Sequence, residues 1–316
     1  MPMADYAPIR VSTLRGDQKI PFDAYVHVAG KYILMCREGD SFEGDRIERL
    51  RGKKLVKMYI AAKKAQVYQD YLHENIKRAY EASNNTSLEI RTQIIHGALQ
   101  AAAEDLTEDP ESKALYNVAL DGAKRFNKFF TAEPKSLEHL LAIKNVDFNI
   151  AHHGVIVAAL SLAICQELGL VEARPMQIDA MLVGCLIHDI EHNYNNVGRS
   201  ERPDLLGRAE KNIYLKHSVD GHDRIKGFIH FDPLVRDIIL NHEEKIDMSG
   251  PRKRREKDLD VFMLVTATAN AFDTSLTYEG QTPREALKKF LIDKMGVLQL
   301  ETMHGLQNAL KKRGLV

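Results

Sequence analysis

The chain has 316 residues, and its 44 lysine and arginine residues equal its 44 aspartate and glutamate residues. This balance excludes a whole-protein field that would draw it to nucleic acid or to an anionic membrane, so we expect neither as a partner. Three cysteines at unrelated spacings argue against a disulfide framework, and without a signal-peptide core or a run of roughly 20 apolar residues the sequence predicts a cytoplasmic protein.

Residues 1–62 have the pattern of a small mixed α/β module. Residues 22–28 and 32–36 are largely apolar runs on either side of a short turn signal, which predicts a hairpin. Residues 41–50 have helical spacing, and residues 57–60 have the composition of one more strand. The module itself carries no motif that identifies it.

The rest of the chain reads as helix. Amphipathic patterns over residues 61–83, 88–103 and 113–130 predict connecting helices, which we assign to residues 63–135. Residues 136–316 then form one larger helical domain. The predicted fold is therefore mostly α, with the small mixed module at its N-terminal end.

Histidines are concentrated in the helical domain. Eight of the thirteen fall between His152 and His242, which is less than a third of the chain. A single histidine is more often a hydrogen-bonded surface or core residue than a ligand. Because eight histidines cluster here, a role as ligands gains weight against a role as ordinary surface or core residues.

The pair His188-Asp189 ends a helix that is apolar on every side. Residues 181–187 have no polar face, so the helix must be buried and must carry the pair into the interior. Because an unpaired buried carboxylate costs several kcal/mol, Asp189 needs a cation or a metal beside it. A metal ion satisfies both residues at once.

Three further segments supply ligand-type side chains. His153 begins an apolar helical pattern one segment earlier, and His217 lies on a later helical stretch. His242-Glu243 directly follows the apolar run at residues 234–240. Four segments therefore deliver imidazole and carboxylate groups.

These pieces resemble a known family when taken in order. The series resembles the HD-GYP family of metal-dependent cyclic di-nucleotide phosphodiesterases over roughly residues 140–290, because four motifs in one order form a specific signal. The motifs are His153, His188-Asp189, His217-x-x-x-Gly221 and His242-Glu243-Glu244-x-x-Asp247. The resemblance implies a helical HD-type metal-binding domain for residues 136–316.

The sequence departs from the family at several positions. Where the family has His-His-Glu-x-x-Asp-Gly-x-Gly-Tyr-Pro, residues 242–251 read His-Glu-Glu-Lys-Ile-Asp-Met-Ser-Gly-Pro, without the tyrosine. Two acidic ligands of the family correspond to Asn149 and Asn270, and its lysine after His-Asp corresponds to His192. The family's arginine-bearing segment is replaced by residues 277–282. The chain therefore resembles a divergent, tyrosine-lacking member.

The resemblance implies a ligand set for two metal ions. It consists of His153, His188, Asp189, His217, His242 and Glu243. Six such residues exceed what one ion usually takes from a protein, so we expect two ions with Asp189 as the bridge. Mixed imidazole and carboxylate ligands suit iron or manganese, and the family favours iron. With Asn149 in place of an acid, we expect no third ion.

Other residues are candidates for catalysis and substrate binding. Asp189 and His192 are the predicted catalytic residues, with His192 as proton donor to the leaving oxygen or as an extra ligand. The alternative for His192 is a helix-terminal histidine that contacts the last carbonyls. Arg252, Lys253 and Arg254 are predicted to bind substrate phosphates, although such charge runs are usually solvated. Residues 194–203 read as a polar loop in the position of a lid.

The leading hypothesis is a phosphodiesterase that hydrolyses a cyclic di-nucleotide of the cyclic di-GMP class, or a related phosphodiester, with a metal-bridging hydroxide as nucleophile. The alternative is a catalytically weak or inactive signalling receptor or scaffold that acts on a partner protein through its N-terminal module. A third reading, a nucleotide phosphohydrolase with one ion at His153, His188 and Asp189, leaves His217 and His242 without a role.

Overall fold

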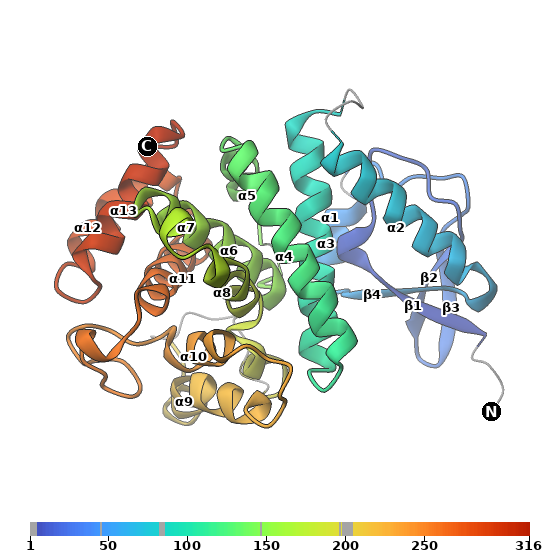
Figure 1. Cartoon of the computed structure of the whole chain (residues 1–316). Coiled ribbons are helices and arrows are strands. Elements are labelled where there is room, and N and C mark those ends of the chain that lie inside the picture. The colour runs from blue at the N-terminus through green and yellow to red at the C-terminus, as the bar shows by residue number, and fades with distance from the viewer. Residues whose placement is uncertain (1–4, 45, 82–85, 146, 196, 198–204) are drawn as a thin grey trace. The chain divides into compact units, whose positions relative to one another are not determined.

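The computed structural model describes residues 5–316 except 45, 82–85, 146, 196 and 198–204 (Figure 1). The chain divides into two compact units, Met1–Ala101 and Ala102–Val316. Helix α3 (Leu88–Glu108) begins in the first unit and ends in the second. The division predicted at residues 62 and 135 stays a prediction. The predicted fold class is confirmed, since a small sheet module precedes a chain of helices.

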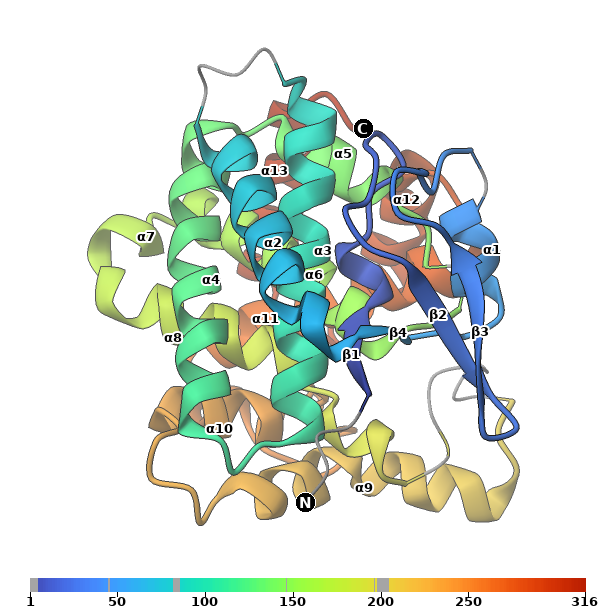
Figure 2. The same ribbon diagram turned by 90° about the vertical axis from the view of Figure 1, so that its right-hand side faces the viewer.

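The first unit is built on an antiparallel sheet (Figure 2). Its strands lie in the order β1 (Tyr6–Arg10), β4 (Lys57–Ala61), β2 (Ala24–Val28) and β3 (Lys31–Cys36). The predicted hairpin is confirmed as β2 and β3, and its turn has positive φ at Ala29 and Gly30, as tight hairpins prefer. Strand β1 was not singled out from the sequence.

One face of this sheet carries the core of the first unit. Phe22, Met58 and Ile60 are fully buried there, and Tyr68 and Tyr71 of α2 (Ala65–Tyr80) pack against them. Their hydroxyl groups also accept hydrogen bonds from backbone amides, Tyr68 from Arg10 at 3.4 Å and Tyr71 from Arg15 at 3.1 Å. The core therefore ties the first long helix to the end of β1.

Helix α1 (Arg46–Gly52) begins later than predicted. The pattern favoured a helix from residue 41, but Phe42 is buried at 1% exposure and Gly44 has a φ of +62°. A residue in the left-handed region interrupts a right-handed helix. The short 3-10 turns η1 (Val11–Thr13) and η2 (Ala62–Lys64) flank strands of the sheet.

The second unit contains helices and no strand among its described residues. After α3, its α-helices are α4 (Lys113–Ala132), α5 (Ser136–Ala142), α6 (Ile150–Glu167), α7 (Leu170–Ala173), α8 (Pro175–Ile187), α9 (Arg208–Ile225), α10 (Pro233–Asn241), α11 (Val261–Glu279), α12 (Pro283–Asp293) and α13 (Leu300–Lys312). The 3-10 turns η3 (Ile190–Asn193) and η4 (Glu256–Asp258) lie between them. The helices predicted from residues 88 and 113 begin there.

Helix α6 is the central helix of this unit. It packs against α8, α11 and α13, so its side chains are apolar on nearly every side. Within the described part of the chain it is long and apolar enough to cross a membrane by length and composition, which the sequence analysis did not expect, but 83% of it is buried. A helix enclosed by three others needs this composition without any membrane.

Two glycines let α8 approach its neighbours closely. A Cβ placed on Gly154 of α6 would lie 2.3 Å from the carbonyl oxygen of Leu186, and one on Gly184 would lie 2.9 Å from Ile238 of α10. Real Cβ contacts are longer, so only glycine fits the first crossing. Because Gly154 follows His153 and Leu186 precedes His188, this crossing brings the two histidine-bearing segments together.

We expect Gly154→Ala to destabilise the protein by roughly 1 to 3 kcal/mol or more, since the added methyl group meets a backbone carbonyl that cannot rotate away. Thermal unfolding followed by circular dichroism measures this. Gly227→Ala is the matched control, because a Cβ there has no atom within 4 Å. Equal melting temperatures for the two variants would show that the crossing is looser than described.

Candidate metal centre

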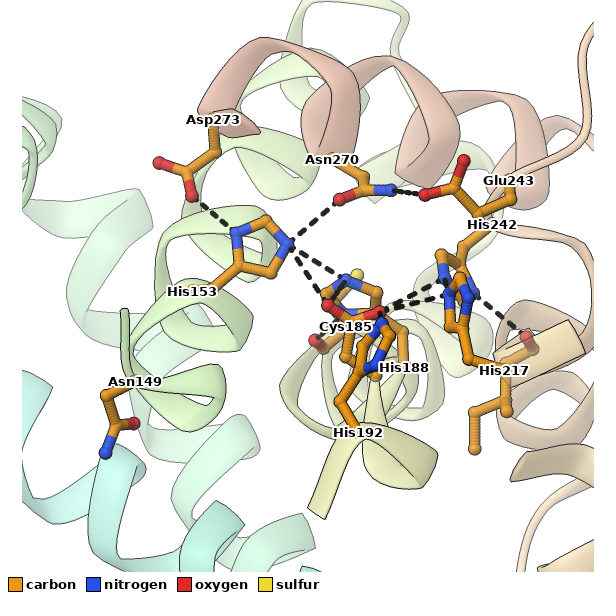
Figure 3. Close-up of polar contacts among 12 residues, drawn as sticks. Asn149, His153, Cys185, His188, His192, His217, His242, Glu243, Asn270 and Asp273 are labelled. Carbon is orange, nitrogen blue, oxygen red and sulfur yellow. Dashed lines mark hydrogen bonds and ion pairs between the residues drawn. The ribbon is translucent and has the colours of Figure 1, made fainter. Parts of the chain in front are cut away.

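The carboxylate of Asp189 lies between two pairs of histidines. Its Oδ2 atom is 3.8 Å from Nε2 of His153 and 3.6 Å from Nε2 of His188. Its Oδ1 atom is 3.3 Å from Nε2 of both His217 and His242. All five side chains are at most 1% exposed. The structure therefore brings together five of the six predicted ligands, whose imidazole rings converge in Figure 3.

These five residues form two groups that share one member. His153, His188 and Asp189 have ligand atoms within 4.8 Å of one another, and so have Asp189, His217 and His242. Within each group the two imidazole Nε2 atoms face each other, at 3.1 Å for His153 and His188 and at 2.9 Å for His217 and His242. Imidazole nitrogens that converge on a buried carboxylate form a set of ligands suited to a metal ion.

Hydrogen bonds behind the rings fix which nitrogen faces the centre. In three histidines Nδ1 donates to the backbone carbonyl three residues earlier, and since a carbonyl only accepts, Nδ1 carries the proton. These bonds join His188 to Cys185 at 2.7 Å, His217 to Tyr214, and His242 to Ile239 at 2.9 Å. Neutral rings of this tautomer present an unprotonated Nε2 to the centre, as metal ligation requires.

The fourth histidine is oriented by a carboxylate. Nδ1 of His153 lies 2.5 Å from Oδ2 of Asp273 on α11 (Figure 3). This contact directs Nε2 of His153 toward Asp189. The sequence analysis gave Asp273 no role. Its position one turn after Asn270, on the same face of one helix, was the signal available.

Burial and charge act in opposite directions on these rings. Burial lowers the pKa of His188 well below its usual value and outweighs the carboxylate of Asp189 beside it. Burial also lowers the pKa of His217, but Asp189, with help from Glu243, raises it above the usual value. The buried negative charge of Asp189 therefore favours a cation on the His217 side.

His192 lies beside the cluster, behind His217. Its Nε2 atom is 4.0 Å from Oδ1 of Asp189. Its ring stacks on His217, with centroids 4.4 Å apart, and on Tyr214, with centroids 5.2 Å apart. The predicted roles as proton donor or extra ligand stay predictions.

Glu243 lies next to the cluster and contacts it through Asn270. The amide nitrogen of Asn270 donates to Glu243 at 3.1 Å, while its Oδ1 lies 2.9 Å from Nε2 of His153 (Figure 3). Glu243 is absent from the two described ligand groups, so its role as a ligand stays a prediction. Asn270 keeps an oxygen aimed at the cluster although it lacks the charge of the family's aspartate.

Asn149 takes part in the fold of α6. Its Oδ1 atom accepts a hydrogen bond from the backbone amide of His152 at 2.9 Å, which caps the helix. Its amide nitrogen donates to Glu104 at 3.2 Å. Figure 3 shows it apart from the ring cluster.

The basic residues 252–254, which follow α10, are held in place by a buried glutamate. Both oxygens of Glu244, which is 2% exposed, accept backbone amides, from Arg252 at 2.6 Å and from Arg254 at 2.8 Å. A Cβ on Gly250 would lie 2.7 Å from Cα of Glu244, so this loop folds tightly over it. Lys253 and Arg254 are exposed, and the guanidinium of Arg252 donates to Asn241 at 2.8 Å.

A pocket of about 510 Å³ opens beside His242. Its described lining includes Lys211, Lys245 and Lys294, and it does not include the predicted phosphate-binding residues 252–254. The lysines come from separate segments, which explains why no sequence motif revealed them. Most of the predicted lid, residues 196 and 198–203, lies outside the described residues.

Comparison with known proteins agrees with this geometry. Residues 150–295 match the HD domain family. The fold and the buried histidine and aspartate cluster thus define an HD-domain protein of the metal-dependent phosphohydrolase class. The solved structure of Bd1817, a HDG"Y"P protein from Bdellovibrio bacteriovorus, matches with a TM-score of 0.91 and 39% identity, over 97% of this chain and 100% of that chain. The chain belongs to the HD-GYP family as a divergent member.

Two curated relatives are more distant. The cyclic di-GMP phosphodiesterase PA4108 of Pseudomonas aeruginosa is 27% identical over 141 residues, which cover 44% of this chain and 33% of that protein. The cyclic di-GMP phosphodiesterase of Thermotoga maritima is 25% identical over 235 residues, which cover 61% of each. The chain therefore spans about a third of one relative and three fifths of the other.

We expect Glu243→Gln to lose metal from the purified protein, beyond the roughly 10- to 100-fold drop in affinity that follows when only a supporting contact is lost. The physical reason is the carboxylate charge, which this centre needs in the absence of acids at positions 149 and 270. Elemental analysis by mass spectrometry measures the metal content.

Asn241→Ala is the control for the Glu243 variant, because the amide of Asn241 already donates to the carbonyl of Asp237 at 2.7 Å and accepts from Arg252. We expect this variant to keep its metal. The opposite result, with metal retained in Glu243→Gln and lost in Asn241→Ala, would show that Asn241, and not Glu243, stands at the position of a metal ligand of the family.

Proposed function

We propose that this protein is a metal-dependent phosphodiesterase that hydrolyses a cyclic di-nucleotide of the cyclic di-GMP class or a related phosphodiester. The observation that carries the proposal is the carboxylate of Asp189, shared between two groups of convergent imidazoles. Such a carboxylate suits two adjacent ions, and paired ions are a common device for phosphoester hydrolysis. The names of the two curated relatives support the substrate class.

In this proposal two ions bind, with iron favoured over manganese. His153 and His188 would hold one ion, and His217 and His242 would hold the other. Asp189 would serve both ions, and Glu243 would be a further ligand. Imidazole and carboxylate donors without cysteine favour these metals over a structural zinc. When bound, paired ions lower the pKa of a shared water and neutralise the charge that develops on the phosphate during an in-line displacement.

The chain's own residues contribute positioning and proton transfer. The carbonyl bonds of the three helix-borne histidines and the bond from His153 to Asp273 keep every Nε2 aimed inward without further rearrangement. The stacking of His192 on His217 beside the cluster supports its proposed role, which is to hold a proton for the leaving oxygen. Because the cluster is buried, bulk water is kept away from it except at positions where a ligand binds.

A receptor or scaffold with weak or no turnover is the second candidate. The observations that favour it are the amides Asn149 and Asn270 in place of acids, the missing tyrosine and the absence of arginine from residues 277–282. Groups that act mainly on the transition state affect turnover more than binding. In that case the protein keeps its metal and signals through a partner of its N-terminal module.

We expect the protein, purified under gentle conditions with metal supplied, to contain about two transition-metal ions per chain, predominantly iron, because a shared Asp189 completes two sites. Elemental analysis measures the number. Asp189→Asn is expected to lose both ions, whereas His153→Gln is expected to lose one. A single ion in the unmodified protein would contradict the binuclear proposal.

We expect slow hydrolysis of cyclic di-GMP, below that of an HD-GYP enzyme with the tyrosine and the downstream arginines, because this chain lacks their clamps on the transition state. Separation of the reaction products by chromatography measures the rate. Asp189→Ala is expected to abolish turnover, and His222→Ala, a partly exposed histidine on α9, serves as the control. Complete absence of turnover with two ions bound would favour the receptor.

A further inference from the structure

The His217 side of the cluster depends on how α9 packs against η3. Asp189 directly precedes η3, whereas His217 lies on α9. Nδ1 of His217 donates to the carbonyl of Tyr214 on the same helix, so the ring moves with α9. The distance of 3.3 Å between its Nε2 and Oδ1 of Asp189 is therefore set by the position of the helix. Metal–ligand distances vary by only about 0.2 Å in well-formed sites, so a small shift of α9 is enough to weaken binding.

An arginine and a glutamate join these two segments. Nε of Arg224, on α9, donates to Oε2 of Glu191, in η3, at 2.8 Å, and its Nη2 donates to Oε1 at 3.0 Å. The side chains of Arg224 and Glu191 are 32% and 10% exposed. Because two parallel hydrogen bonds fix the orientation of both groups, this pair restricts the helix more than a single surface ion pair does.

The pair lies close to the cluster along both segments. Glu191 comes two residues after Asp189, and Arg224 comes seven residues, about two helical turns, after His217 on the same face of α9. Gly221 lies between these two turns. A Cβ on Gly221 would lie 3.1 Å from the side chain that precedes Glu191 in η3 and 3.5 Å from Cβ of Glu191 itself. The helix and η3 are therefore in close contact between the histidine and the arginine.

A tyrosine supports the flat face of the arginine. The guanidinium carbon of Arg224 lies 3.6 Å from the centre of the Tyr194 ring. The hydroxyl of Tyr194 donates to the carbonyl of Thr107, on α3, at 2.6 Å, so the ring is itself held in place. The guanidinium is thus fixed in its plane by Glu191 and on its face by Tyr194. A lysine has neither the planar fork nor the flat face for these two contacts.

We infer that Arg224 and Glu191 are positioning residues for one of the two metal sites. It is the site of Asp189, His217 and His242, because the pair fixes α9 against the segment that carries the carboxylate. The inference rests on the proposed function, since it requires metal at these ligands. The other site takes its histidines from α6 and from the end of α8, so the pair has little effect on it.

The experiment titrates the metal-free full chain with Mn²⁺ and measures the heat of binding. Arg224→Gln should weaken one of two binding events by roughly 10- to 100-fold, the usual effect of losing a group that orients a metal ligand, and leave the other unchanged. Arg224→Lys keeps the charge without the fork and should weaken it less. Glu191→Gln should match Arg224→Gln, and the double variant should be no weaker than either, because both remove the same contact.

Arg174→Gln is the matched control. Arg174 also pairs with a carboxylate, at 2.9 Å from Asp260, and its guanidinium also lies over a ring, 4.6 Å from the centre of Phe262. Its side chain is 33% exposed, close to the value for Arg224. Both arginine variants should lower the melting temperature of the metal-free protein similarly, but only Arg224→Gln should weaken Mn²⁺ binding. This comparison separates positioning from a general loss of stability.

Three results would overturn the inference. They are unchanged Mn²⁺ affinity in Arg224→Gln, equal weakening of both binding events, and the same weakening in Arg174→Gln. The proposed binuclear centre is tested separately, by the number of Mn²⁺ ions that the unmodified protein binds. A single ion there would contradict the binuclear centre, while the effect of Arg224→Gln on that ion would still decide whether the pair positions a metal site.

Discussion

The burial of one carboxylate constrains the whole second unit. Asp189 is 1% exposed at the end of an apolar helix, where an uncompensated charge costs several kcal/mol. Four imidazoles surround it, and each is held by a carbonyl or a carboxylate on its far side. The arrangement is stable only if the segments that carry these groups meet at one point, so the fold and the site depend on the same contacts.

Those contacts require neighbouring helices to approach one another closely. Gly154 allows α6 to reach the backbone of α8, and Gly184 allows α8 to reach α10. Apolar side chains fill the remaining space around α6, which is why that helix has the hydropathy of a membrane span while lying in a protein interior. Packing energy thus holds polar groups in positions that their own desolvation opposes.

Local patterns in the sequence account for much of this picture. The hairpin of β2 and β3, the starts of α3 and α4, and the convergence of His153, His188, Asp189, His217 and His242 were predicted from spacing, burial and resemblance. The contact between His153 and Asp273 was not, because 120 residues separate the partners and only tertiary packing joins them. The pocket lysines were missed for the same reason, and β1 and the start of α1 depended on partners elsewhere in the first unit.

The loop over Glu244 has a consequence for how such proteins diverge. Its course is fixed at two points, by the glutamate oxygens that accept the amides of Arg252 and Arg254 and by Gly250 against the backbone of Glu244. Backbone amides are common to nearly all residue types, so the side chains displayed along the loop are free to change without altering its path. A member of the family is thus able to lose the signature tyrosine and to change the ligands that it binds. The metal-binding scaffold beneath the loop stays the same.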